Sequence, residues 1–390
     1  MSAANLRAWL ATEIATKGPI TVERYMRECL MHPEFGYYRR RQAIGAAGDF
    51  ITAPEISQIF GELIGIWTAA AWAGLGEPKR WRLIELGPGR GTLMSDLLRA
   101  LKVLPAARAG VEVVLVEGNA VLREQQRAAL EGCGVPVAWA DETFPSGLDW
   151  PELPTIVIGN EFLDALPIRQ LVAVHGKWHE RCVDVAVPTP RSAASFETRP
   201  PGAQDEVKGL GEGTVPSFQF VDTPDPVPAT YPEVSIAHEG AVYEVMSSAA
   251  EYIGAVSLAL GEIPSYMLFI DYGHEGPLPG DTLQAVSGHR YADPLAAPGE
   301  HDLSAQVDFS QVRDAASRLN FEAYGPITQA EFLGWLGGAE RLQRLTRGKD
   351  AATVQAMQSG LARLMQPDGM GGRFKAIVLA RKGVARPPVF

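Results

Sequence analysis

The stretch RLIELGPGRGTL, residues 82–93, decides the fold class. An apolar run and an acid, Glu85, stand directly before three glycines at alternate positions, Gly87, Gly89 and Gly91. Glycines at this density let a ligand approach the backbone closely, because no side chain intervenes. We therefore expect a strand, a ligand-binding loop and a helix here. An ordinary tight turn without a ligand is the alternative interpretation.

The sequence around this loop alternates between strand-like and helix-like segments. The strand-like runs are 81–86, 111–117, 135–140, 155–160 and 265–273, with helical periods at 92–104 and 120–130. Strands that alternate with helices predict a parallel sheet covered on both faces, which is a Rossmann-like α/β fold. The run 373–382 predicts one more strand, of the kind that closes such a sheet as an antiparallel edge.

The rest of the chain predicts additions to this core. Residues 59–75 form an apolar run that is too short to span a bilayer and contains Glu62, so we expect a buried helix. Residues 169–187 alternate like an antiparallel hairpin that turns at Gly176, and 186–232 predict a long surface loop. The predicted organisation is an N-terminal helical and lid segment (1–80), the first part of the core (81–170), an inserted β element and loop (171–263), and the remaining core with substrate-side helices (264–390).

Composition excludes several classes of function. The net charge of −11 and the pI near 5.2 argue against a nucleic-acid partner, which favours a basic surface. Three widely spaced cysteines form no C-x-x-C pattern and suit a reducing compartment. His175 and His179 flank Gly176 in the hairpin-like pattern, so no metal pair is predicted. Without a signal-like apolar segment at the N-terminus, we expect a cytoplasmic bacterial protein.

The residues around the glycines indicate a ligand without phosphate. A P-loop needs a Lys after its last glycine, and none follows Gly91. A dinucleotide loop has the spacing G-x-G-x-x-G and binds pyrophosphate, an anion that Glu85 would repel. S-adenosylmethionine carries an ammonium and a sulfonium instead. Glu85 can attract that ammonium while Gly87 and Gly89 let the backbone approach, so we predict S-adenosylmethionine as the cofactor.

Acids at the ends of the next two strands extend this prediction. Glu117 ends the run 111–117, where it can accept hydrogen bonds from both ribose hydroxyls. Asp141 follows the run 135–140 and can accept from the adenine amino group. Two other interpretations stay open. Glu117 can instead cap the following helix, and Asp141 can be a residue of a turn.

Several motifs resemble the MidA family of class I S-adenosylmethionine-dependent methyltransferases. They are GDFITAPEISQIFGELIG at 48–65, ELGPGRGTLMSDLLRAL at 85–101 and GNEFLDALP at 159–167, with HPEFGYY at 32–38, DYG at 271–273 and AQVDF at 305–309 in matching order. The family includes the mitochondrial arginine methyltransferase that helps assemble respiratory complex I. The resemblance therefore implies a methyltransferase whose acceptor is an arginine on a protein linked to respiratory NADH dehydrogenase. Where the family often has DPFG before GDF, this chain has RQAIGAAGDF at 41–50.

The motif GNEFLDALP supplies the residues that such an acceptor needs. A guanidinium requires carboxylates that hold it, orient one nitrogen and favour its deprotonation. Glu161, Asp164 and Asn160 follow the fourth strand, at the sheet edge where ligands gather in open α/β folds. If a helical turn begins there, Glu161 and Asp164 share a face. Alternatively, Asp164 caps a helix and Glu161 serves only the structure.

The segment GDFITAPEIS is predicted to be a loop between two apolar helices. Its polar residues Thr52 and Glu55, beside Pro54, can form a lid over the methionine end of the cofactor; a packed interhelical turn is the other interpretation. Two further functions stay open beside arginine methylation. One is methylation of a small molecule, and the other is an assembly chaperone of the same fold without catalysis.

Overall fold

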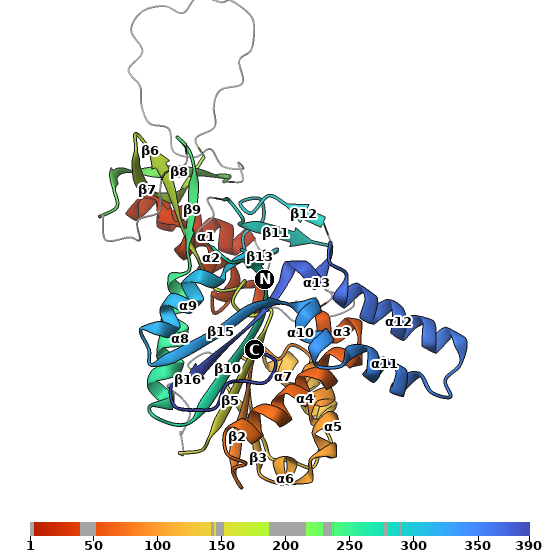
Figure 1. Ribbon diagram of the computed structural model, residues 1–390. Helices are drawn as coiled ribbons and strands as arrows, with labels where there is room; N and C mark the ends of the chain where they lie inside the picture. The colour runs from red at the N-terminus through yellow and green to blue at the C-terminus, as the bar shows by residue number, and fades with distance from the viewer. Residues whose placement is uncertain are drawn as a thin grey trace, which may run out of the picture.

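The computed structural model describes residues 4–39, 52–141, 144–145, 152–186, 216–228, 236, 238–276, 280–288 and 290–390. An eight-stranded sheet forms its centre, in the order β15-β16-β10-β5-β2-β3-β4, with β14 paired to β10 (Figure 1). Its strands are β2 (Trp81–Leu86), β3 (Val111–Val116), β4 (Val137–Ala140), β5 (Thr155–Asn160), β10 (Ser265–His274), β14 (Val307–Asp308), β15 (Phe321–Thr328) and β16 (Phe374–Arg381). The strands from β10 to β4 run parallel to one another, which confirms the predicted α/β class.

One prediction about the sheet edge is wrong. Strand β16 is antiparallel, as expected, but it lies between β10 and β15, and β15 forms the edge. The sequence of β15 conceals a strand because it contains Gly325 and Pro326. The pairing shifts between Tyr324 and Ile327, around a proline that has no N–H to donate. Proline is tolerated in edge strands and at bulges, which explains its place here.

Alternate side chains of each central strand enter two separate cores. In β10, Met267 and Phe269 pack on one side, with α8 (Ser247–Leu260) and α9 (Phe309–Ser317). Leu268 and Ile270 pack on the other, with α4 (Gln58–Gly74) and α5 (Thr92–Ala100). Both cores consist of buried apolar side chains, and helices cover both faces of the sheet. Helix α4 is the buried helix that the sequence predicts.

The inserted region forms a separate antiparallel sheet beside the core. Its strands are β1 (Ile20–Thr21), β6 (Arg169–Val174), β7 (Lys177–Val185), β8 (Phe218–Pro226) and β9 (Val242–Val245). The predicted hairpin is present as β6 and β7, with His175 and Gly176 at the turn. Part of the predicted loop 186–232 is instead strand β8, whose prolines are typical of loops and therefore did not indicate a strand. Residues 187–215 and 229–235 lie outside the described residues.

Helices complete the two ends of the chain. Before the core come α1 (Ala4–Lys17), α2 (Val22–Met31), η1 (Tyr37–Arg39) and α3 (Ala53–Ile56); within it lie η2 (Leu101–Val103), α6 (Pro105–Ala109) and α7 (Ala120–Ala129). The predicted helical region 328–366 contains α10 (Gln329–Trp335), α11 (Gly338–Thr346) and α12 (Ala351–Met365), followed by α13 (Met370–Arg373). A small sheet joins β11 (Gln284–Ser287), β12 (Arg290–Ala292) and β13 (Asp302–Ser304).

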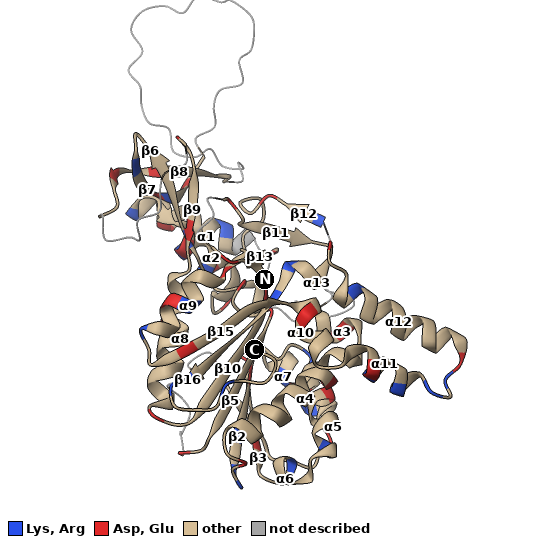
Figure 2. Cartoon of the chain, viewed as in Figure 1, with Lys and Arg blue, Asp and Glu red and all other residues tan. Residues whose placement is uncertain are grey.

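Two properties of the surface bear on possible partners. Within the described ranges, every helix is too short or too polar to cross a membrane. Acidic and basic residues are mixed along α11 and in the loop that leads to α12, rather than separated by sign (Figure 2).

Candidate cofactor and acceptor site

The glycine loop adopts a conformation that requires glycine. Gly87, Gly89 and Gly91 have φ angles of 61°, 52° and 84°, all in the left-handed region that disfavours side chains. Helix α5 begins directly after Gly91. A Cβ atom on Gly91 would lie 3.2 Å from the Cα of Gln126, so this glycine also permits close packing of the loop against α7. The loop thus presents bare backbone at the carboxyl end of β2.

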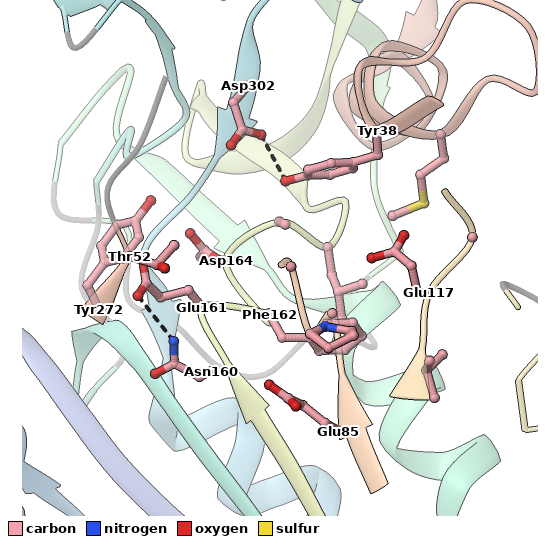
Figure 3. A pocket seen from close by; sticks show the side chains of 18 of the residues that line it. Tyr38, Thr52, Glu85, Glu117, Asn160, Glu161, Phe162, Asp164, Tyr272 and Asp302 are labelled. Carbon is pink, nitrogen blue, oxygen red and sulfur yellow. Dashed lines mark hydrogen bonds between the residues drawn. The ribbon is translucent and has the colours of Figure 1, made fainter. Parts of the chain in front are cut away.

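A cavity of about 1300 Å³ opens over the carboxyl ends of the central strands. It brings together residues predicted from distant parts of the chain, as Figure 3 shows for most of them. The predicted residues that line it are Thr52, Pro54, Glu55, Glu85, Gly87, Gly89, Glu117, Asn160, Glu161 and Asp164. Two predicted residues, Gly91 and Asp141, do not line it among the described residues.

Glu85 lines this cavity with a carboxyl oxygen that lacks a partner among the described residues. Its side chain is buried, and its Oε2 atom has no hydrogen-bond partner within the described part of the chain. Burial raises the pKa of Glu85 to about 8, because the carboxylate loses its hydration. A ligand ammonium at this point would supply the missing partner. The Glu85 carboxylate therefore fits the ammonium at the amino-acid end of S-adenosylmethionine, and the glycines of the adjacent loop leave room for that end of the cofactor.

Glu117 and Gln126 form the second part of the cofactor side. The Glu117 carboxylate accepts hydrogen bonds from the backbone N–H of Asn119 at 2.7 Å and from Nε2 of Gln126 at 3.3 Å. Helix α7 is capped by the side chain of Asn119, which accepts from Val121, so Glu117 is not its side-chain cap. Gln126 also donates to the carbonyl of Gly89 at 2.7 Å, which ties the glycine loop to Glu117.

Asp141 lies apart from these residues. It is exposed, and its carbonyl accepts a hydrogen bond from the N–H of Phe144 at 3.0 Å, as in a turn. A residue within β4 contacts the cofactor side: Nε1 of Trp139 donates to Oε1 of Gln126 at 2.8 Å, and Gln126 in turn donates to Glu117. This geometry agrees with the turn interpretation of Asp141, and its contact with adenine stays a prediction.

The acidic motif after β5 forms a turn rather than the helical turn considered from the sequence. Residues 161–166 contain no helix, and Glu161 has a φ of 51°, an unusual left-handed conformation for this residue. Its Oε1 atom accepts hydrogen bonds from Nδ2 of Asn160 at 3.1 Å and from the N–H of Ala53 at 2.9 Å. Glu161 and Asp164 both reach the cavity in this arrangement.

The acids of this turn lie in an environment that favours their neutral forms. Burial raises the pKa of Glu161, while hydrogen bonds from Ala53 and Asn160 oppose that shift. Burial raises the pKa of Asp164 well above its usual range, and the nearby carboxylates Asp271, Glu161 and Asp302 add to the shift. Asp164 Oδ1 has no hydrogen-bond partner among the described residues. A cation entering here would lower both pKa values and satisfy this oxygen.

A second wall of the cavity was not predicted from the sequence. The hydroxyl of Tyr38 donates to Oδ1 of Asp302 at 2.9 Å (Figure 3). Tyr272 donates to Oγ of Ser304 at 2.6 Å and accepts from Nε2 of Gln284 at 2.8 Å. Tyr38 and Tyr272 belong to the quoted motifs HPEFGYY and DYG, whereas no pattern marks Asp302, which comes from the small sheet at β13.

The described part of the segment GDFITAPEIS is the short helix α3, with Thr52 before it. Oε1 of Glu55 accepts from the hydroxyl of Thr92 at 2.6 Å, and its Oε2 lies 3.5 Å from Nη1 of Arg90. These contacts fasten α3 to the glycine loop and the start of α5. The position over the loop agrees with a lid, which remains a prediction, and residues 40–51 lie outside the described residues.

The strand order, the left-handed glycine loop and the acids at the strand ends define a class I-like methyltransferase. Residues 63–327 match the model of one family of S-adenosyl-L-methionine-dependent methyltransferases, and the chain belongs to that family. S-adenosyl-L-methionine is accordingly its cofactor. A solved structure of a COG1565 superfamily member from Burkholderia thailandensis, bound to S-adenosyl-homocysteine, is 28% identical with a TM-score of 0.78. The match covers 100% of this chain and 95% of that one.

Curated relatives give a finer comparison. The Drosophila melanogaster protein arginine methyltransferase NDUFAF7 homolog, a mitochondrial protein, is 34% identical over 96% of this chain and 84% of its own length. The human protein arginine methyltransferase NDUFAF7, also mitochondrial, is 33% identical over 95% of this chain and 82% of its own length. The similarity therefore spans nearly the whole chain, although the solved relative is bacterial and these two are mitochondrial.

Proposed function

We propose that this protein transfers a methyl group from S-adenosyl-L-methionine to the guanidinium of an arginine in a protein substrate. The observation that carries the proposal is the pair of acids, Glu161 and Asp164, in the same cavity as the glycine loop. Among the described residues, no Lys or Arg forms an ion pair with either acid. Two carboxyl groups that are unpaired with any cation among the described residues suit a cationic acceptor, which would favour their ionised forms.

The bound cofactor supplies an electrophilic methyl group on its sulfonium. Glu161 is held rigidly through Oε1 by Asn160 and Ala53, so its Oε2 is the atom left to bind the acceptor. Asp164 can accept a second hydrogen bond from the same planar guanidinium through Oδ1. Two such contacts orient one nitrogen, and a carboxylate can then take the proton that the methylated nitrogen loses.

The names of the relatives support the choice of acceptor. The fly and human relatives are both named protein arginine methyltransferases. The resemblance to the MidA family adds a narrower expectation, in which the substrate is a subunit of respiratory NADH dehydrogenase or of its bacterial counterpart. The proposal keeps the bacterial cytoplasm expected from the sequence as the place of the reaction, although the two named relatives are mitochondrial.

The test is mass spectrometry of candidate NADH dehydrogenase subunits after incubation with the protein and methyl-labelled cofactor. We expect label on arginine, and its loss when that arginine is replaced by Lys in the substrate. Label that appears only on small molecules in a cell extract would favour the small-molecule alternative. Cofactor binding without any transfer, together with retained binding of a subunit, would favour the chaperone.

A further inference from the structure

We propose that Asp271 is a positioning residue for methyl transfer: it fixes the backbone of residues 162–164 and thereby aims Glu161 and Asp164 into the cavity. The inference rests on the proposed function, because it takes those two acids as the groups that act on the acceptor. Asp271 itself does not line the cavity and cannot touch the acceptor from its place in β10.

The contacts of Asp271 are directed at one turn. Its Oδ2 atom accepts hydrogen bonds from three successive backbone N–H groups, those of Phe162 at 3.0 Å, Leu163 at 2.8 Å and Asp164 at 3.4 Å. Its Oδ1 atom accepts from the N–H of Tyr272 at 3.1 Å. Both oxygens are thus occupied, and the side chain is fully buried.

The turn needs such an acceptor for two reasons. Successive N–H groups at the end of a buried strand cost free energy when they stay unpaired, and a carboxylate is a stronger acceptor than a neutral group. Glu161 also has its φ of 51°, which persists only where surrounding contacts hold it. The N–H of Glu161 donates to the carbonyl of Ile270 at 2.9 Å. Strand β10 therefore contacts the turn at the strained residue and at the three residues that follow it.

The charges around Asp271 make its effect electrostatic as well as geometric. Glu161 and Asp164 face it from the turn, and Asp302 acts on Asp164 from β13. Lys375 of β16 is its cross-strand partner, but its ammonium donates to the carbonyl of Gly273 at 2.8 Å. Ionised Asp271 consequently raises the pKa of Asp164, and loss of that charge should let Asp164 ionise at lower pH.

The decisive variant is Asp271→Asn, which keeps the shape but places an NH₂ group against backbone donors. We expect single-turnover methyl transfer to fall on the order of 100-fold through misplacement of the acids, with the Kd for S-adenosyl-homocysteine within about twofold of the native value. The acid limb of the pH–rate profile should move to lower pH. Amides 162–164 should exchange with solvent faster, and a crystal structure should show a lengthened contact between Glu161 and Ala53.

Glu244→Gln is the matched control. Glu244 is a buried carboxylate that also accepts from two successive backbone N–H groups, those of Thr282 at 2.9 Å and Leu283 at 3.2 Å, and it does not line the cavity. This variant should lose stability without a change in transfer rate or pH profile. If Asp271→Asn behaves like it, Asp271 is merely structural.

Failure of the proposed function would look different. In that case the native protein would not methylate arginine. Amide exchange and the crystal structure of Asp271→Asn would still show whether the turn at 162–164 depends on Asp271. An unaltered turn, with Glu161 and Asp164 in place and native exchange rates, would overturn the positioning role whatever the acceptor.

Discussion

Oε1 of Glu161 accepts a hydrogen bond from the backbone N–H of Ala53 at 2.9 Å, across 108 positions of sequence. The contact joins the acidic turn after β5 to the first residue of α3. Since Glu55 in the same helix is bonded to Thr92 beside the glycine loop, α3 spans the cofactor side and the acceptor side of the cavity. The two halves of the site are therefore held together by a segment that precedes the whole core in sequence.

Glu161→Gln tests the acceptor side directly. The change removes a negative charge and keeps the shape, so a guanidinium would lose its charge-assisted contact and its proton acceptor. Because such assistance is typically worth about 10²–10⁴-fold, single-turnover transfer should fall by at least 100-fold. Cofactor affinity, measured by calorimetry, should stay within about twofold.

The control is Glu180→Gln, which alters a buried carboxylate that is paired with Arg169 on the inserted sheet and lies outside the cavity lining. Transfer should be unaffected there. Near-native transfer by Glu161→Gln would reject Glu161 as catalytic, since a neutral acceptor needs no anion, and would move the small-molecule alternative ahead.

Local patterns predicted the centre of the fold well. The run WRLIEL forms β2, and the apolar positions of 59–75 form the buried part of α4. Both elements are predictable because an apolar run or a helical period is a signal contained within a short stretch of sequence. Strands β8 and β15 were missed because Pro and Gly within them read as loop signals. Their pairing depends instead on neighbours far along the chain, β7 and β16.

The site residues also fall into two groups: those that a local pattern marks and those that depend on contacts with distant segments. Residues at strand ends, such as Glu85 and Glu117, are marked by their position after an apolar run and do line the cavity. Asp271 and Asp302 act through contacts with residues more than a hundred positions away, at Phe162 and Tyr38. No local period marks such a contact, because it exists only once distant segments of the chain have packed together.

Glu85→Gln tests the ammonium contact by the number of protons released when the cofactor binds. The pKa of Glu85 is about 8 in the free protein, so its carboxyl is mostly protonated at pH 7. An α-amino group has a pKa of about 7.7–8.0 and is mostly charged there. Pairing the two should therefore release roughly 0.8 of a proton at pH 7, which calorimetry in buffers of different ionisation enthalpy measures. The variant should bind more weakly and release none; equal release by both proteins would place the ammonium elsewhere.

Glu117→Ala tests the ribose contact. Hydrogen bonds to a charged acceptor are worth about 1.5–3 kcal/mol each before solvent compensates, so cofactor affinity should drop clearly. The native protein should discriminate against a 2′-deoxy analogue, and the variant should barely do so. Helix α7 keeps its cap in the variant, because Asn119 Oδ1 still accepts from Val121. Equal discrimination by both proteins would remove Glu117 from the ribose site.

The raised pKa of Glu85 also predicts how stability depends on pH. The folded protein holds this proton up to about pH 8, whereas the unfolded chain loses it near 4.5. The group's contribution to the free energy of unfolding is thus complete below pH 4.5 and is lost as pH rises towards 8, at about 1.4 kcal/mol per unit. Glutamine resembles the protonated acid and does not ionise.

Glu85→Gln should therefore match the native protein in denaturant unfolding at pH 4.5 and exceed it in stability at pH 8.5, in the absence of cofactor. The difference should grow steadily between these two values. Such a gain on losing a cofactor-binding group means that the native site accepts a destabilising carboxylate for the sake of its ligand. A constant difference across this range would show that Glu85 ionises as freely in the folded protein as in the unfolded chain, which would reject its raised pKa and the proton release expected on cofactor binding.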